Sequence, residues 1–536
     1  MTAQNHKNQS GPVSFKAPAP LLPDYLSLHA RWQANHPALV TSDGSVSWAD
    51  FDKATNRIAN GLKKQGLGPG DHVAVVMNNG RAMMEALFGI MKAGCCSVPL
   101  NLSVSDDALA AMLADSDAKG ILVTDQQRPR LDAIFQTAKR PALCLCADEA
   151  AADWLSLSQW MGRFTDTSPA IAIPPDAPCN IIYSSGTTGL PKGIVHSHQG
   201  RLHWAYDIAL AYGYRAGAKS LCTIGLYSNI MWAVMLATLL GGGTVVVHDA
   251  FDAKQALDDI KRLRITHTAM VPVQWQRLVD AGADTQSLAS LQSAITVGSP
   301  MPVDLKRQML ALMPTAFFEL YGLTEGILTV LAPDDMTNRL TSVGKPIPGC
   351  DIRLIDDEGH PCSHDEAGEI VSRARYVMPG YLNRPDATEE SQWRDEKGDI
   401  WLRTGDVGRL DDKDYLYIVD RKKDMILSGG QNIYPADIEA VLLRHDAVSD
   451  CAVIGVPDDR WGETPIAIVV AATAITAEDL QQWLNERLGK QQRVRAIVFA
   501  DTLPRNPNGK ILKRVLRAQY QKGLYDRLSV PHCYQR

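Results

Sequence analysis

The 536-residue chain lacks the features that mark membrane-embedded, secreted and nucleic-acid-binding proteins. No run approaches the roughly 20 apolar residues that a membrane helix needs. Residues 1–12 are polar and lack the apolar centre of a signal peptide. The net charge of -6 gives no reason to expect nucleic acid or an anionic membrane as partner, and the ten cysteines lack the spacing of a zinc site or a secreted disulfide framework. We therefore expect a cytoplasmic protein whose cysteines are mostly buried in a reducing compartment.

Strand and helix patterns alternate from about residue 25 onward. Apolar runs at 72–77, 96–100 and 244–247 predict buried strands, and amphipathic stretches at 82–93 and 253–263 predict helices. Such alternation predicts an α/β fold in which parallel sheets are covered by helices on both faces. Ligands of such folds bind beyond the carboxyl ends of the strands.

The pattern changes after residue 344. Short strands with frequent Gly, Pro and Asp turns fill residues 344–419 and predict a small, distorted barrel or sheet. The charged run 420–424 then reads as a linker to a compact α+β unit. We predict a large N-terminal domain, residues 1–422, with a small β-barrel-like subdomain, and a small C-terminal domain, residues 423–536.

A loop rich in glycine and hydroxyl groups follows the short apolar run 180–183. From Tyr183 to Gly193 it reads Tyr-Ser-Ser-Gly-Thr-Thr-Gly-Leu-Pro-Lys-Gly. Glycines let backbone N–H groups turn inward around an anion, hydroxyls add donors, and Lys192 adds a positive charge. It is not a P-loop, because no Ser or Thr follows Lys192. A flexible surface loop is the alternative for this composition, but the predicted phosphate ligands are Ser184, Ser185, Gly186, Thr187, Thr188, Gly189 and Lys192.

Three later stretches carry groups that suit a nucleotide. The run Tyr321-Gly322-Leu323-Thr324-Glu325 combines an aromatic face with a carboxylate for a hard cation. Asp406 can accept both hydroxyls of a ribose. Lys510, in Pro504-Arg505-Asn506-Pro507-Asn508-Gly509-Lys510-Ile511, can offset charge on a phosphorus under attack. Each stretch alone is more often a strand end, a turn or a solvated charge, but their order along the chain favours one shared site.

Taken together, these stretches resemble the ordered motifs of the AMP-forming adenylate-forming superfamily, and its acyl-CoA synthetase branch in particular. The resemblance implies that Tyr321 stacks on adenine, that Asp406 and Arg421 hold the ribose, and that Glu325 holds Mg²⁺ with help from Ser184. It also implies that Lys510, Glu325, Thr187 and Lys192 are catalytic. The implied ATP contacts beyond the phosphate loop are Gly298, Ser299, Pro300, Glu319, Leu320, Tyr321, Gly322, Thr324, Asp406, Arg421 and Lys510.

The resemblance also extends to a second substrate, coenzyme A. The stretch with Ser428, Gly429 and Gly430 is similar to the lining of the thiol tunnel in acyl-CoA synthetases, where missing side chains leave room for a pantetheine arm. Trp461 resembles an aromatic residue that stacks on the adenine of coenzyme A. Lys423 occupies the family's hinge position, so the resemblance implies a mobile C-terminal domain.

Residues around 206–232 are the candidates for the acyl pocket. We predict that Tyr227, Ser228 and Trp232 line it, with Tyr206 and Met231 as further candidates, and the alternative is that they are core residues. Their character favours an apolar acid, either aromatic or of medium to long chain. Many family members carry an aromatic residue followed by His here, whereas this chain has Tyr227 followed by Ser228.

The predicted activity is an ATP-dependent carboxylate–CoA ligase that forms an acyl-AMP, releases pyrophosphate and transfers the acyl group to coenzyme A. ATP, Mg²⁺ and coenzyme A are the expected cofactors and co-substrates. One alternative is a stand-alone adenylation enzyme that loads a carrier protein, and another is a non-catalytic nucleotide-binding protein. Luciferase-like oxidation is a remote third alternative. The resemblance leaves a homodimer open.

Overall fold

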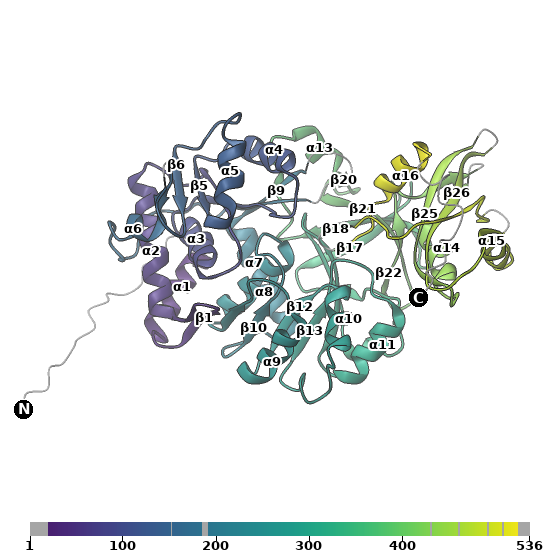
Figure 1. Ribbon diagram of the computed structural model, residues 1–536, viewed down its shortest axis with the longest axis horizontal. Helices are drawn as coiled ribbons and strands as arrows, with labels where there is room; N and C mark the ends of the chain where they lie inside the picture. The colour runs from purple at the N-terminus through teal and green to yellow at the C-terminus, as the bar shows by residue number, and fades with distance from the viewer. Residues whose placement is uncertain are drawn as a thin grey trace, which may run out of the picture.

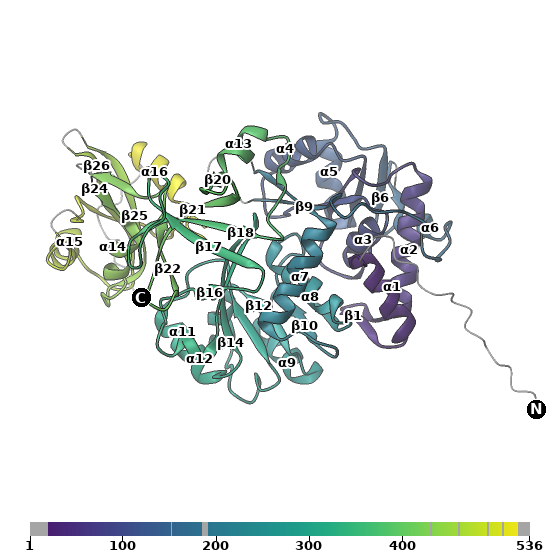
Figure 2. The same ribbon diagram turned by 180° about the vertical axis from the view of Figure 1, so that it is seen from behind.

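The computed structural model describes residues 20–151, 153–184, 191–428, 431–458, 461–489, 492–505 and 509–523. Its strands form four sheets, two of them large and mostly parallel. Figure 1 shows the two large sheets with their helices toward the N-terminal end, and the C-terminal unit with β25 and β26 at the opposite end. The same arrangement is seen from behind in Figure 2.

The first large sheet has eight strands in the order β19-β9-β8-β4-β3-β5-β6-β7. Strands β8 to β7 along this order are parallel, and β9 and β19 extend the edge in antiparallel pairing. The strand bounds are β3 His72–Val76, β4 Cys96–Pro99, β5 Gly120–Val123, β6 Leu143–Cys146, β7 Leu155–Ser156, β8 Pro178–Tyr183, β9 Gly193–Ser197 and β19 Gly380–Tyr381.

The second large sheet has nine strands in the order β16-β15-β14-β13-β12-β10-β11-β1-β2. Its centre, from β14 to β1, is parallel, and the two strands at β16 and β15 and the edge strand β2 are antiparallel. The bounds are β1 Pro37–Thr41, β2 Gly44–Ser47, β10 Lys219–Cys222, β11 Thr244–Val247, β12 His267–Met270, β13 Ser293–Thr296, β14 Phe317–Leu323, β15 Ile327–Leu331 and β16 Lys345–Pro346.

Helices cover both faces of each large sheet. One core lies between the two sheets and joins buried residues of β1, β3, β5 and β11 with five helices: α1 Leu22–Trp32, α2 Trp48–Lys64, α3 Arg81–Lys92, α7 His198–Tyr212 and α8 Asn229–Leu240. The outer faces carry separate cores under α4 Asp106–Ser116 and α5 Arg128–Ile134, and under α9 Ala253–Leu263, α10 Pro272–Asp280 and α11 Val303–Leu312. Short helices are η1 Asp125–Gln127, α6 Leu157–Met161 and α12 Pro333–Met336. The predicted α/β fold with parallel sheets is confirmed.

The third sheet is antiparallel and has five strands, with the order β17-β18-β21-β20 and β22 paired to β21. Its bounds are β17 Cys350–Ile355, β18 Gly368–Ala374, β20 Gln392–Arg394, β21 Ile400–Leu410 and β22 Leu416–Arg421, with α13 Pro385–Glu390 beside it. The predicted barrel-like subdomain is therefore, in its described residues, a sheet with an open strand order.

The C-terminal unit is built on a sheet in the order β24-β23-β26-β25, with β27 paired to β26. Helices pack over separate cores on it, with Leu442 of α14 and Leu484 of α15 in one and Leu516 of α16 in the other. The bounds are β23 Ile426–Ser428, β24 Gln431–Ile433, α14 Pro435–Leu442, β25 Val448–Asp458, β26 Gly462–Ala471, α15 Ala477–Asn485, β27 Ile497–Phe499 and α16 Lys513–Gln521. A smaller α+β unit after the large one is thus confirmed, and the predicted boundary at 422/423, which falls between β22 and β23, stays a prediction.

Helix starts follow their capping residues. The Ser47 hydroxyl accepts a hydrogen bond from the Asp50 amide at the start of α2, and Thr476 does the same for Asp479 at the start of α15. Such caps satisfy amides that have no partner inside the helix. Among the described residues, no helix is long and apolar enough to cross a membrane.

Candidate functional site

The neck of the predicted phosphate loop is held by two hydrogen bonds. The Ser184 amide donates to the Lys192 carbonyl at 2.9 Å, and the Lys192 amide donates to Ser184 Oγ at 3.3 Å. The loop thus leaves β8 and returns as β9 with its ends clamped together. Ser185, Gly186, Thr187, Thr188 and Gly189, all predicted phosphate ligands, lie outside the described residues.

One tyrosine that the sequence patterns did not single out, Tyr381, contacts both Glu325 and Lys192. Tyr381 donates a hydrogen bond from its hydroxyl to Glu325 Oε1 at 3.0 Å, and Lys192 Nζ lies 4.8 Å from the centre of its ring. Burial raises the pKa of Glu325, and the hydrogen bond from Tyr381 opposes that rise. No local pattern marks Tyr381, because it lies 56 residues from Glu325 in the chain.

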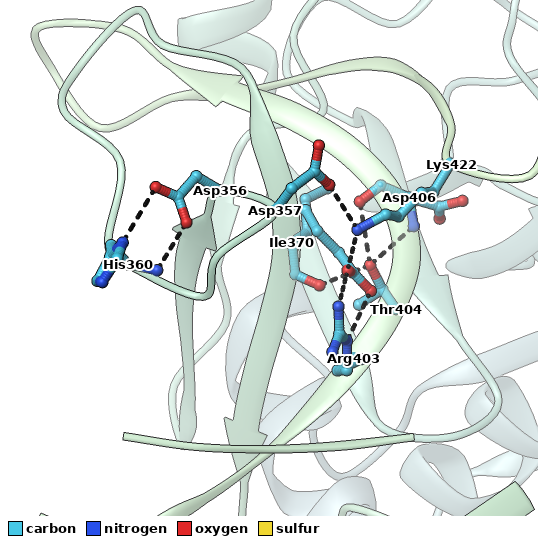
Figure 3. Close-up of polar contacts among 9 residues, drawn as sticks. Asp356, Asp357, His360, Ile370, Arg403, Thr404, Asp406 and Lys422 are labelled. Atoms are coloured by element: carbon cyan, nitrogen blue, oxygen red, sulfur yellow. Dashed lines mark hydrogen bonds and ion pairs between the residues drawn. The ribbon is translucent and has the colours of Figure 1, made fainter. Parts of the chain in front are cut away.

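The predicted adenine and ribose residues form one connected group. Tyr321 donates from its hydroxyl to Asp406 Oδ2 at 2.7 Å, and Arg421 Nε lies 2.7 Å from Asp406 Oδ1 in an ion pair. The Thr404 hydroxyl accepts from the Asp406 amide and donates to the Ile370 carbonyl, as Figure 3 shows. A carboxylate offers about four lone-pair directions, so Asp406 keeps the capacity to accept from a ribose.

Lys510 reaches this group from the C-terminal unit. Burial, with Arg421 nearby, lowers the pKa of Lys510 to about 8, while Asp406 acts in the opposite direction. A Cβ placed on the neighbouring Gly509 would lie 3.9 Å from Ser299 Oγ, so this loop also approaches the end of β13. Residues 299, 406, 421 and 510, which are far apart in the sequence, therefore lie around one place in the structure.

Several other predicted contacts have different surroundings. The Glu319 side chain is buried in an ion pair with Lys306 of α11. Gly322 is required by the β14–β15 hairpin, since a Cβ there would lie 2.5 Å from the Ile327 carbonyl oxygen. Leu320 packs against the central core, Thr324 lines a narrow crevice between α7 and the turn that joins β14 to β15, and Gly298 and Pro300 are exposed after the end of β13. Their roles toward ATP stay predictions.

The residues on both sides of Lys423 in the linker are held by polar contacts of their side chains. Lys422 Nζ lies 3.0 Å from Asp357 Oδ1 and 3.2 Å from Glu369 Oε2, both in or beside the third sheet, and Figure 3 shows this side chain reaching Asp357. On the other side, Arg517 of α16 donates to Asp424 Oδ1 at 3.0 Å. Residue 422 is thus held by the N-terminal part and residue 424 by the C-terminal unit. Burial lowers the pKa of Lys423 between them.

The predicted coenzyme A and acyl residues are only partly described. Ser428 pairs with Gly462 in the C-terminal sheet, Trp461 is 49% exposed, and Gly429 and Gly430 lie outside the described residues. Tyr227 is half-buried, and Ser228 is buried at the start of α8.

Three further residues of the predicted acyl region differ in their burial. Trp232 and Met231 are fully buried in the central core, where the Trp232 indole donates to the Leu226 carbonyl, which agrees with the core alternative, and their role at the acyl pocket stays a prediction. Tyr206 is 37% exposed and its ring contacts the ring of Tyr25, and its role at the acyl pocket stays a prediction.

A loop with clamped ends after β8, a carboxylate just past β14 and the buried Asp406 of β21 are the described features of the predicted nucleotide site, and the first two lie at the ends of parallel strands, where α/β proteins bind their ligands. The family described as AMP-binding enzyme matches residues 26–382, and its C-terminal domain matches residues 437–510. The chain therefore belongs to the AMP-binding enzyme family, which confirms the predicted superfamily.

Known relatives match nearly end to end. A feruloyl-CoA synthase of Amycolatopsis is 35% identical over 92% of this chain and 97% of its own length. A fatty acid–acyl-carrier-protein ligase, ScoC of Streptomyces coeruleorubidus, is 34% identical over 92% of this chain and 95% of its own. The solved o-succinylbenzoate CoA synthetase of Bacillus subtilis, in complex with its acyl-adenylate intermediate, has a TM-score of 0.80 at 29% identity and covers 92% of this chain and 97% of its own.

Proposed function

We propose that this protein is an AMP-forming acyl-CoA synthetase that uses ATP, Mg²⁺ and coenzyme A. The proposal rests most on Lys510, which is close enough to Asp406 and Arg421 for their charges to act on it, because a lysine of the C-terminal unit would then serve the predicted nucleotide site. Membership of the AMP-binding enzyme family and the named ligases among its relatives support the same reaction.

In the first step, a carboxylate oxygen of the acid attacks the α-phosphorus of ATP. The bond to the β-phosphate breaks, pyrophosphate leaves, and a mixed acyl-phosphate anhydride forms. A free carboxylate is a poor acyl donor because its leaving group would be oxide, whereas the anhydride releases AMP. The ammonium of Lys510 offsets the charge that grows on the phosphorus oxygens, and Asp406 with Arg421 orients the ribose.

Glu325 suits the predicted Mg²⁺ site. Among the described residues it forms no salt bridge, and its hydrogen-bond partner Tyr381 is a neutral donor, so its negative charge is available to a cation. Carboxylate and phosphate oxygens are the ligands that Mg²⁺ prefers. A bound Mg²⁺ would neutralise phosphate charge, and Glu325 with the Ser184 hydroxyl would hold it.

In the second step, the thiolate of coenzyme A attacks the acyl carbon, the anhydride bond breaks and AMP leaves. The linker supports a rotation of the C-terminal unit between the steps, because Lys422 and Asp424 are anchored to different parts of the molecule while Lys423 lies between them. Such a rotation would remove Lys510 and bring the stretch around Ser428, Gly429 and Gly430 to the acyl-adenylate. Trp461, which is exposed, would stack on the adenine of coenzyme A.

The proposal also covers the acid that is activated, the acceptor of the acyl group and the oligomeric state. We favour an apolar acid, aromatic or of medium to long chain, with Tyr227 and Ser228 at its pocket. One relative is a carrier-protein ligase, so a carrier protein is the second candidate acceptor. We also propose a cytoplasmic location and leave a homodimer to sedimentation measurements.

The test is pyrophosphate release with a panel of aryl and fatty acids, followed by thioester detection with free coenzyme A or with a phosphopantetheinylated carrier protein. We expect acid-dependent pyrophosphate release and a thioester with coenzyme A. A thioester with the carrier alone would favour the second acceptor. Nucleotide binding without pyrophosphate release, whichever acid is supplied, would support a non-catalytic protein instead.

A further inference from the structure

A short segment, residues 378–382, connects the predicted metal carboxylate to the neck of the phosphate loop. We propose that Tyr381 in this segment is a positioning residue that keeps Glu325 and Lys192 apart and aligned, so that each meets its own part of Mg²⁺-bound ATP. This inference rests on the proposed function, and it assigns a role to a residue that the sequence motifs do not contain.

The segment is bound to both sides by its backbone. The Met378 amide donates to the Glu325 carbonyl at 2.8 Å, and the Leu382 amide donates to the Gly193 carbonyl at 2.7 Å. In between, β19 pairs with β9, so that Tyr381 lies opposite Ile194. The end of β14 and the end of the phosphate loop are therefore fixed relative to each other through this one segment.

Tyr381 is also held by contacts with α13. The Tyr381 amide donates to Thr388 Oγ1 at 2.9 Å. The Thr388 hydroxyl in turn donates to the Arg384 carbonyl at 2.9 Å. A Cβ on the preceding Gly380 would lie 2.9 Å from Thr388 Cγ2, so α13 packs directly on this turn. Such packing fixes the backbone from which the Tyr381 side chain extends, as a positioning role requires.

The two contacts of Tyr381 have opposite charge and use different parts of its side chain. Its hydroxyl donates to Glu325 at 3.0 Å, and its ring lies 4.8 Å from the Lys192 ammonium. A neutral hydroxyl orients a carboxylate without neutralising it, and an aromatic face attracts an ammonium without neutralising it. Among the described residues, neither Lys192 nor Glu325 forms a salt bridge.

The physical consequence is that both charges stay available. If Lys192 and Glu325 were free to meet, an ion pair between them would compete with the phosphate for the ammonium and with the cation for the carboxylate. Tyr381 occupies the place between them. It therefore favours a state in which the lysine binds the phosphates and Glu325 presents its second oxygen to Mg²⁺.

The test compares two substitutions of Tyr381 with a matched control. Tyr381→Phe removes the hydroxyl and keeps the ring, whereas Tyr381→Leu removes both. The control is Tyr417→Phe, because the Tyr417 hydroxyl donates to Asp411 at 3.3 Å in the third sheet, away from Lys192 and Glu325. Binding of ATP is titrated by calorimetry at several Mg²⁺ concentrations without any acid, and the kinetic constants of pyrophosphate release are measured in parallel.

For Tyr381→Phe we expect the Mg²⁺ concentration at half-saturation to rise about tenfold, since loss of a residue that orients a metal ligand weakens metal binding by this order. At saturating Mg²⁺ its kcat should stay within about twofold of the wild type, and its affinity for metal-free ATP should not change. Tyr381→Leu should weaken ATP binding at every Mg²⁺ concentration, because Lys192 can then pair with Glu325. In a Glu325→Gln background, Tyr381→Phe should add no further change.

The inference is overturned if Tyr381→Phe and Tyr417→Phe have the same Mg²⁺ dependence, or if Tyr381→Phe adds its full effect in the Glu325→Gln background. It is also overturned if the wild type binds no ATP with Mg²⁺. A wild type that binds Mg²⁺ and ATP but releases no pyrophosphate would contradict the proposed function instead, and the binding titrations would still decide the role of Tyr381. Melting temperatures of all variants serve to exclude general unfolding.

Discussion

The two sides of the candidate site are built in different ways. On the N-terminal side, Asp406 is 4% exposed and is fixed by Tyr321 and Arg421, which lie in β14 and β22. On the other side, Lys510 belongs to a unit with its own sheet and cores, joined to the rest by one linker. In the proposed function, nucleotide binding therefore uses a preformed frame, whereas the charge for adenylation is delivered by a separate unit.

The largest effect is expected for Lys510→Ala, which tests whether the C-terminal unit supplies the charge for adenylation. Adenylate formation should fall by about a thousandfold, because a charge aimed at the transition state is lost from a buried site. Thioester formation from a supplied acyl-adenylate should stay nearly unchanged, since the proposed second step does not use Lys510. Pyrophosphate release and thioester formation are measured separately, with exposed Lys522→Ala as control. Equal loss in both steps would contradict delivery of Lys510 to one step only.

The frame itself is tested by Asp406→Asn. This change removes the charge that pairs with Arg421, so the KM for ATP should rise at least tenfold and the free energy of unfolding should fall by about 1–3 kcal/mol. Denaturant titration and initial-rate kinetics measure the two effects. Asp412→Asn, at an exposed position nearby, should change neither. An unchanged KM for ATP would remove Asp406 from the nucleotide site.

The connection between the two sides is tested by Lys423→Pro. Proline fixes the backbone angle φ near −65°, so a residue that must rotate would be stiffened. We expect about a tenfold loss in the thioester step and a smaller loss in adenylation, because the described arrangement already places Lys510 near Asp406. Lys423→Ala, which removes the side chain without this restriction, is the control. An intact thioester step in Lys423→Pro would contradict the hinge.

The smallest expected effect is on pH dependence. Lys510 has a pKa lowered to about 8, so its ammonium loses its proton as the pH rises through this value. Adenylation should therefore decline above about pH 8 while thioester formation from a supplied acyl-adenylate does not. In Lys510→Arg, whose guanidinium stays charged, the alkaline decline should disappear even though the rate is lower. A decline that survives in Lys510→Arg would assign it to another group.

Much of the fold could be predicted from local patterns. The strand at 244–247 and the helix at 253–263 have the predicted bounds, and Thr476 caps α15 as its spacing with Asp479 indicates. These features depend on burial periodicity and on hydrogen bonds between near neighbours. The division of the strands into two large sheets, with helices between them, depends on which apolar faces meet, and local periodicity carries no information on that choice.

The sequence by itself determined which residues are chemically suited to a nucleotide, because a Gly- and hydroxyl-rich loop, Asp406 and Lys510 each carry their character in their own side chains and spacing. Only the tertiary structure decided that Tyr381 lies between Lys192 and Glu325, that Lys306 engages Glu319, and that Trp232 is part of the core. Those contacts join segments that are distant in the chain, and they form only when sheets and helices pack around a common core.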